Sequence, residues 1–356
     1  MNLDDGKAGN NMRRLDVAIP LILGILVFLF LLDLMLGSVN IPPNAFFKIL
    51  TGGTVKVTWM NIFWDWRMPK AITTVFAGGA LALSGLLMQT YFRNPLADPY
   101  ILGISSGASL GVALVMMSAG IFGVGTIFTN GLISGISISM AAILGAFAVL
   151  LLILLISAKI KSNTTILILG IMVSYISGAI VTVLMQFSDE SSMHSYSIWT
   201  MGSFSGVTWS QLPFLVILVL AGFILSLCLV KPLNALLLGE QYAESMGMNY
   251  DHIRKVIILT TALMAGAVTA FCGPVGFLGI ATPHFCRALF VTADHRVLVP
   301  GCIIIGGILA LCTDIISHVP GTNIILPVNA ITALFGAPVV IWVIIRGTRF
   351  GRGVTT

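Results

Sequence analysis

The stretch Gly78–Gly111, GGALALSGLLMQTYFRNPLADPYILGISSGASLG, decides how the rest of the chain is interpreted. Two runs of small and apolar residues flank a short polar elbow, RNPLADP, at residues 93–99. Gly103, Gly107 and Gly111 follow one another at four-residue steps, a spacing that lets helix backbones approach closely in lipid. The stretch therefore predicts a close-packed hairpin of two helices at the centre of a membrane bundle.

The composition of the chain is typical of a membrane protein. Of its 356 residues, 57% are hydrophobic and 9% are charged, whereas a soluble domain carries roughly 25% charged residues. Residues 99–158 contain no charge at all, and a spanning helix needs about 20 apolar residues. We therefore predict an all-α polytopic membrane protein. The alternating segments of about 10 residues that would indicate a β-barrel are not seen.

The apolar runs predict ten transmembrane helices in a single domain that covers residues 1–356. Their expected ranges are 17–37, 69–91, 101–120, 132–157, 164–187, 210–231, 253–271, 276–291, 298–318 and 328–346. Two long outer loops are expected at about 38–68 and 188–209. The longest inner loop is expected at about 231–255.

The basic residues predict that both termini lie in the cytoplasm. With the N-terminus inside, the 18 Lys and Arg residues all fall on the cytoplasmic side except Lys48, Lys56, Arg67 and Lys70. Cytoplasmic loops carry an excess of Lys and Arg. Adding or removing one span would scramble this separation, so the rule favours an even number of spans.

A weak internal repeat relates two of the predicted helices. GALALSG at residues 79–85 resembles AVTAFCG at residues 267–273. Each segment opens the second helix of a five-helix half, so the halves would be inverted in the membrane, as in many transporters. Chance similarity between runs of small residues explains the match equally well, and the inverted repeat is a hypothesis.

Two sequence motifs of catalysis are absent. The chain has no GxxxxGK[ST] phosphate-binding loop and no HExxH motif. Its five histidines are scattered, and its five cysteines lie in or beside apolar runs without a CxxC pair, which favours a packing role for the thiols. We expect no metal site, no cofactor and no enzymatic activity in this chain.

The inner loop predicts a short amphipathic helix, a turn and a second short helix. Its central residues, 233–247, read LNALLLGEQYAESMG. Such an element either docks into a groove on a soluble partner or rests on lipid headgroups. The residues of the loop leave both alternatives open.

Charged residues near the outer ends of the predicted spans give a second set of candidates. Asp314 lies inside a late span, with His318 one helical turn further on the same face. An intramembrane carboxylate is a functional candidate by default, but we favour a structural pair near the outer boundary. Asp33 is interpreted as an interfacial residue. Arg67 and Lys70 are either a solvated helix start or a docking site for an acidic surface.

Seven segments together resemble the FecCD-type, cobalamin-permease-like family, the permease subunits of bacterial type II ABC importers for iron-siderophores, haem and cobalamin. Their order and spacing carry the resemblance more than any one of them does. They are RMPK (67–70), GALALSGLLMQTYFRNPLADPYILGISSGASLG (79–111), IWTMGSFSGVTW (198–209), LGEQYAESMG (238–247), GPVGFLGIATPHFCR (273–287), TADHRVLVPGC (292–302) and LPVNAITALFGAPVVIW (326–342).

The resemblance implies a cobalamin-permease-like fold in the bacterial inner membrane. It implies a homodimer that encloses the translocation path, with two cytoplasmic ATPase subunits below and a periplasmic substrate-binding protein above. ATP hydrolysis would then reside in the separate ATPase subunits, and nucleic acid would not be a partner. The alternative is an ion-gradient-driven secondary transporter, which would need acids along its path, and only Asp314 is available.

The resemblance also assigns three sets of residues. The cytoplasmic gate would consist of Asn94, Leu96, Asn163 and Thr164. The contacts with the ATPase would be Gly239, Glu240, Ala243, Met246 and Gly247. Docking of the binding protein would use Arg67, Lys70 and His318, the last at a position where the family often has arginine. The sequence does not select one cargo among the iron-siderophores, haem and cobalamin.

Overall fold

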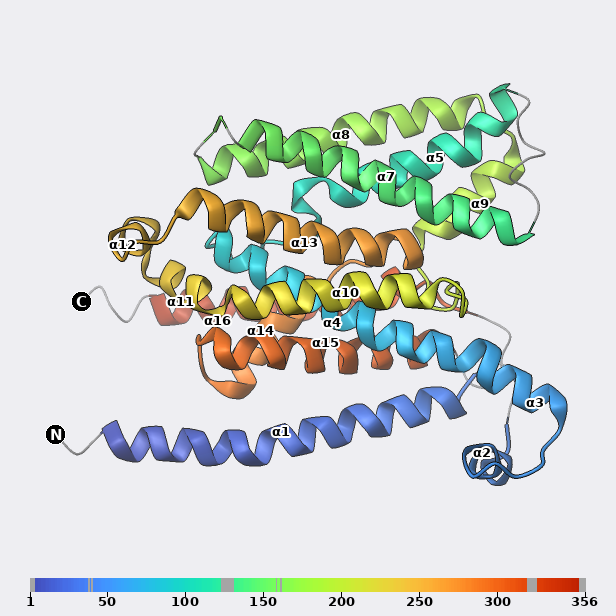
Figure 1. The fold of residues 1–356 in the computed structure, drawn as a ribbon, viewed down its shortest axis with the longest axis horizontal. Coiled ribbons are helices and arrows are strands. Elements are labelled where there is room, and N and C mark those ends of the chain that lie inside the picture. Colours follow the sequence, from blue (N-terminus) through green and yellow to red (C-terminus); the bar gives the residue numbers. More distant parts are fainter. Residues whose placement is uncertain are drawn as a thin grey trace.

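The computed structural model describes residues 4–37, 39, 41–122, 131–157, 159–160, 162–318 and 325–351. This part of the chain consists of helices joined by turns and loops, and its one β-bridge, between His318 and Ile325, is isolated. The helices lie mostly side by side along one direction and form a bundle (Figure 1). The all-helical prediction is therefore confirmed for the described residues.

Each of the ten predicted spans coincides with a helix. These helices are α1 (Asp4–Met35), α4 (Met68–Tyr91), α5 (Ile104–Phe122), α7 (Gly131–Ser157), α8 (Asn163–Gln186), α10 (Leu212–Cys228), α13 (Tyr250–Cys272), α14 (Leu278–Phe290), α15 (His295–Ser317) and α16 (Val328–Gly351). The largest difference is at α1, which begins well before the apolar run because the polar N-terminal segment continues the same helix.

Length and hydropathy identify fewer certain spans than ten. Within the described residues, five helical segments are long and apolar enough to cross a membrane, and α10 with the following α11 (Val230–Leu238) makes a sixth if this pair, bent by 52°, is one span. The apolar parts of α1, α5 and α16 are shorter. The number ten therefore stays a prediction.

The two outer loops contain short helices that the sequence analysis did not anticipate. They are α2 (Pro43–Leu50), α3 (Val57–Asn61), the π-helical turn η1 (Ile62–Arg67) and α9 (Glu190–Thr200). The elbow is followed by the 3-10 helix η2 (Pro99–Leu102). The inner loop forms the two expected short helices, α11 and α12 (Glu240–Ser245).

Helix α4 is the centre of the bundle, and nearly all of its residues are buried. Its neighbours are α15, α13, α14 and α10. A methyl group at Gly78 would overlap the carbonyl oxygen of Gly306, and one at Gly85 would overlap that of Gly279. Because only hydrogen fits there, the glycines let α4 lie directly against α15 and α14.

The predicted close-packed hairpin of α4 and α5 is wrong in its pairing. The glycine face of α5 packs on α7 instead, where Gly107 and Gly111 lie against Gly145 and Ala141. Small residues show that a helix face approaches a neighbour closely, but they do not identify that neighbour. The elbow thus connects two layers of the bundle, α5 with α7 and α8, and the central group around α4 (Figure 1).

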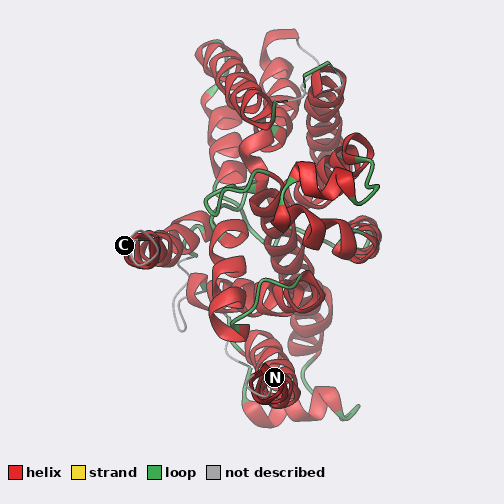
Figure 2. Ribbon diagram, turned by 90° about the vertical axis from the view of Figure 1, so that its left-hand side faces the viewer, coloured by secondary structure: helices red, strands yellow, loops and turns green. Residues whose placement is uncertain are grey.

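The two ends of the bundle differ in what they carry. Figure 1 shows the start of α1, the end of α16, α11 and α12 at one end, and α2, α3 and α9 at the other. Helices α4 and α13 pack together and run in opposite directions, which agrees with inverted halves, although the repeat itself stays a hypothesis. Helix α16 stands to one side of the bundle (Figure 2) and packs mainly on α14 and α15.

Candidate functional site

The elbow between α4 and α5 is a tight turn that Asn94 stabilises. The backbone N–H of Leu96 donates to Oδ1 of Asn94 over 3.0 Å, and the N–H of Ala97 donates to the Asn94 carbonyl over 3.0 Å. The carbonyl of Pro95 lies 2.9 Å from Nε2 of His284 on α14. These contacts fix the backbone of the elbow while Leu96 stays 39% exposed, which suits a gate residue.

Asn163, the third of the four predicted gate residues, bonds directly to a predicted coupling residue. Its Nδ2 atom donates to Oε1 of Glu240 over 2.5 Å and to the hydroxyl of Tyr250 over 2.8 Å. The Tyr250 hydroxyl in turn donates to the same Glu240 oxygen over 2.9 Å. The start of α8, the start of α12 and the start of α13 are therefore joined through three side chains. Thr164 beside them is exposed.

The elbow has its own contact with the inner loop. Nη2 of Arg93 donates to the carbonyl of Leu236 on α11 over 3.4 Å, and it would lie 3.2 Å from a methyl group placed on Gly239. Each predicted gate segment is thus hydrogen-bonded to the α11–α12 segment, residues 230–245. The sequence assigns the gate and coupling residues to separate sets and contains no signal for this connection.

The geometry of α12 separates the predicted coupling residues into two kinds. Met246 is 64% exposed and Gly247 is also exposed, whereas the side chain of Ala243 is fully buried and packs within this chain. Tyr242, which the sequence analysis did not select, is 49% exposed. The surface that α12 offers to a partner therefore includes Tyr242 and Met246.

A glycine with positive φ lies at each end of α12. Gly239 precedes it with φ +122, and Gly247 follows it with φ +85, values that L side chains rarely adopt. The Gly247 N–H donates to the carbonyl of Glu244 (2.9 Å) and the Met248 N–H to that of Ala243 (3.1 Å). This is the Schellman pattern, in which a left-handed glycine ends a helix. Gly247 therefore has a conformational role besides any contact with a partner.

At the other end of the bundle, Arg67 is nearly buried, with 6% of its surface exposed. Its guanidinium donates to the carbonyls of Leu34 (2.9 Å), Met35 (2.6 Å) and Val39. Carbonyls at the end of a helix lack partners within that helix. Arg67 supplies donors at the end of α1.

Lys70 is also buried and pairs with two carboxylates. Its Nζ atom lies 3.0 Å from Oδ1 of Asp33 and 2.5 Å from Oδ2 of Asp314. Nδ1 of His318 is 3.7 Å from the same Asp314 oxygen. The expected structural pair of Asp314 and His318 is therefore present, with Lys70 at its centre. The Asp33 side chain is buried against this cluster, and its place at the membrane interface stays a prediction.

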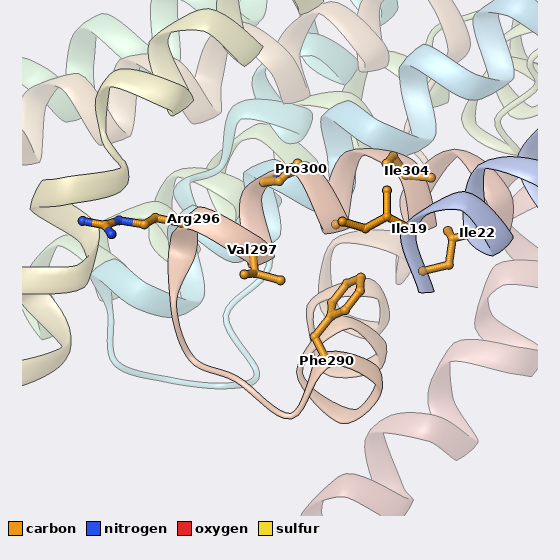
Figure 3. A pocket seen from close by; sticks show the side chains of 8 residues that line it. Ile19, Ile22, Phe290, Arg296, Val297, Pro300 and Ile304 are labelled. Carbon is orange, nitrogen blue, oxygen red and sulfur yellow. The ribbon is translucent and has the colours of Figure 1, made fainter. Parts of the chain in front are cut away.

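The described residues enclose apolar cavities between their helices. One of about 310 Å³ lies between α14, α15 and α16, lined among others by Phe285, Leu309 and Phe335. Another of about 140 Å³ lies between α1, α14 and α15, where Ile19, Phe290 and Ile304 surround it and Arg296 points away (Figure 3). Neither offers a cluster of polar groups. The described residues contain no group of three or more His, Cys, Asp or Glu suited to a metal ion.

This architecture has relatives among known proteins. Residues 25–346 match the FecCD transport family. The vitamin B12 import system permease protein BtuC of Salmonella paratyphi A is 34% identical over 287 residues, which cover 80% of this chain and 84% of that protein. BtuC of Salmonella typhimurium shows the same identity and coverage.

A solved structure is also similar. It is described as an inward-facing conformation of a metal-chelate type ABC transporter, and it superposes with a TM-score of 0.78 at 28% identity. The superposition covers 91% of this chain and 97% of that chain, which confirms the predicted permease fold. The family match and the similar permeases extend over most of the chain, and they show that the protein is a multi-pass membrane permease of the FecCD transport family.

Proposed function

We propose that this permease is the membrane subunit of an ABC importer that carries an iron-siderophore, haem or cobalamin from the periplasm to the cytoplasm across the bacterial inner membrane. The similar proteins support this cargo class, since one group imports vitamin B12 and the solved relative is of the metal-chelate type. ATP hydrolysis would take place in two separate cytoplasmic ATPase subunits, and a periplasmic binding protein would deliver the cargo.

The observation that carries the proposal is the contact of both gate segments with α11–α12. Arg93 next to Asn94 bonds to α11, and Asn163 bonds to Glu240 at the start of α12. An ATPase that moves α12 would therefore also pull on the gate. Such a connection is what an importer with a separate motor subunit requires, whereas a secondary transporter has no use for it.

A second copy of the chain completes the proposed path. Helix α8 exposes large apolar side chains along its length, including Tyr175 (71%), Ile176 (61%) and Val183 (58%). In the homodimer, the gate residues of both copies would close the path from the cytoplasmic side. The predicted spans contain few charged side chains, so the path would bind a bulky cargo only weakly and let it pass.

For the outer face, we propose that His318 contacts the binding protein. Its side chain is 13% exposed, against 7% for that of Lys70. Arg67 and Lys70 belong to the same proposed docking region. To reach acidic groups of a partner, however, Arg67 would first have to break its contacts with α1, and Lys70 its contacts with Asp33 and Asp314. In this conformation both residues therefore stabilise the packing beneath the outer surface.

Reconstitution tests the proposal. The chain, co-expressed with the ATPase and binding protein encoded beside it, is expected to form a complex that takes up cyanocobalamin, ferrichrome or haemin into proteoliposomes only when ATP reaches the ATPase. Uptake by the chain alone, driven by a proton or sodium gradient, would instead support the secondary transporter. Asp314, the acid that the sequence offered for that alternative, is paired with Lys70.

A further inference from the structure

We propose that Tyr250 is a positioning residue whose hydroxyl holds the gate residue Asn163 to the ATPase-facing helix α12. The inference rests on the proposed function, because it specifies how one gate segment follows a motion of α12. Tyr250 lies in none of the three residue sets that the family resemblance assigns.

Three polar atoms form a closed ring at this point. The two hydrogens of Asn163 Nδ2 are directed to Glu240 Oε1 (2.5 Å) and to the Tyr250 hydroxyl oxygen (2.8 Å). The Tyr250 hydroxyl has one proton to donate, which is shared between Glu240 Oε1 (2.9 Å) and Asn163 Oδ1 (3.2 Å). Hydrogen bonds to an ionised carboxylate are about twice as strong as neutral ones. Every donor in the ring is used.

The first turns of α13 hold the ring in place. Tyr250 is 8% exposed and starts α13. One turn later, Arg254 donates to the carbonyl of Ser157 (2.7 Å) at the end of α7 and to that of Ile160 (3.1 Å). Its guanidinium also pairs with Asp251 at 3.1 Å. The first turns of α13 therefore hold both the end of α7 and the start of α8.

This arrangement gives the hydroxyl a role that an apolar ring cannot fill. A phenyl group at position 250 would leave Asn163 Nδ2 with one acceptor fewer and Glu240 Oε1 with one donor fewer, while the packing stayed the same. Asn163 and Glu240 would still touch, but their relative position would no longer be fixed by α13. A displacement of α12 would then change the contact between Asn163 and Glu240 without moving Asn163.

Tyr250→Phe in the reconstituted complex tests the inference, with Tyr91→Phe as the matched control. Tyr91 is 2% exposed and its hydroxyl has no hydrogen-bond partner. We expect Y250F to retain ATPase binding and ATP hydrolysis but to import about fivefold less cargo per ATP, the low end of typical coupling effects. Y91F should match the unaltered chain. If Y250F also imports like the unaltered chain, the inference is overturned.

Exchanging the amide and the carboxylate gives a second test. Asn163→Asp places two carboxylates together and should lower uptake per ATP. Adding Glu240→Gln restores a ring of one amide, one carboxylate and one hydroxyl, so the double variant should regain most of the loss. A double variant no better than N163D would contradict the positioning role. Absence of ATP-driven uptake in the unaltered complex would instead refute the proposed function, which keeps the two failures distinguishable.

Discussion

Asn163 and Glu240 lie 77 positions apart in the sequence, yet the side-chain amide of the first donates to the carboxylate of the second over 2.5 Å. One residue begins α8 and the other begins α12. The contact joins a segment proposed to close the path to a segment proposed to meet the ATPase. It gives the transport proposal a specific physical link.

Lys70 is predicted to be a structural residue. Replacing it with methionine leaves the carboxylates of Asp33 and Asp314 buried without their cation, and breaking a buried ion pair costs about 3 kcal/mol or more. We expect K70M to lower the midpoint of thermal unfolding strongly. The triple variant K70M/D33N/D314N, which removes the charges together, should recover much of the loss. Equal losses in both variants would show that packing, not charge, is responsible.

His318 is predicted to take part in docking of the binding protein. A permanent cation there should attract an acidic partner more strongly, so we expect His318→Arg to tighten binding about threefold at low salt. The gain should shrink as salt rises, since exposed charges separated by about 10 Å are largely screened at 0.1 M. The exposed cations Lys48 and Lys56 supply a control. If K48E/K56E weakens binding and H318R has no effect, docking lies on α2 and α3 instead.

Gly247 is predicted to affect coupling through both shape and contact. Its positive φ disfavours L residues by roughly 1–2 kcal/mol, while asparagine tolerates that conformation better. We expect G247V to uncouple ATP hydrolysis from uptake, and G247N to do so as well if the side chain meets the ATPase. Normal coupling in G247N alongside loss in G247V would leave Gly247 with only its conformational role.

Asp98 is predicted to make stability depend on pH. Burial raises the pKa of this carboxyl to about 6, although the hydrogen bond from the Tyr100 N–H lowers it in part. Between about pH 4 and pH 6 the folded chain therefore holds a proton that the unfolded chain releases, so the free energy of unfolding falls as pH rises through this window. Asp98→Asn keeps the acceptor for Tyr100.

The Asp98→Asn variant should unfold at a temperature about 2 °C higher than the unaltered chain at pH 7, with no gain at pH 4. Thermal unfolding in detergent at the two pH values measures this. A gain of the same size at both pH values would rule out the buried charge as the cause.

The spans could be predicted from the sequence because lipid allows few alternatives. Long apolar segments must satisfy their own backbone hydrogen bonds, so each becomes a helix. The two short helices of the inner loop followed from its leucines and the glycine at 239. The short helices of the outer loop were missed because residues 43–61 have neither length nor a continuous apolar run.

Contacts between distant segments could not be predicted. Nothing local to Lys70 shows that its partners are Asp33 and Asp314, and nothing local to Tyr250 marks it as a link. The glycines at 78 and 85 showed that a close neighbour exists but not that it is α15 or α14. Family resemblance proposed the gate and coupling positions, whereas the hydrogen bonds between these positions are seen only in the fold.

The most direct test measures the gate itself. Spin labels at position 96, introduced as Leu96→Cys in the complex of two permease copies with its ATPase, report the separation of the two elbows. We predict that this distance changes when a non-hydrolysable ATP analogue is added, and that Y250F reduces the change at a second label pair placed at position 164. No change with nucleotide at either position would contradict the account.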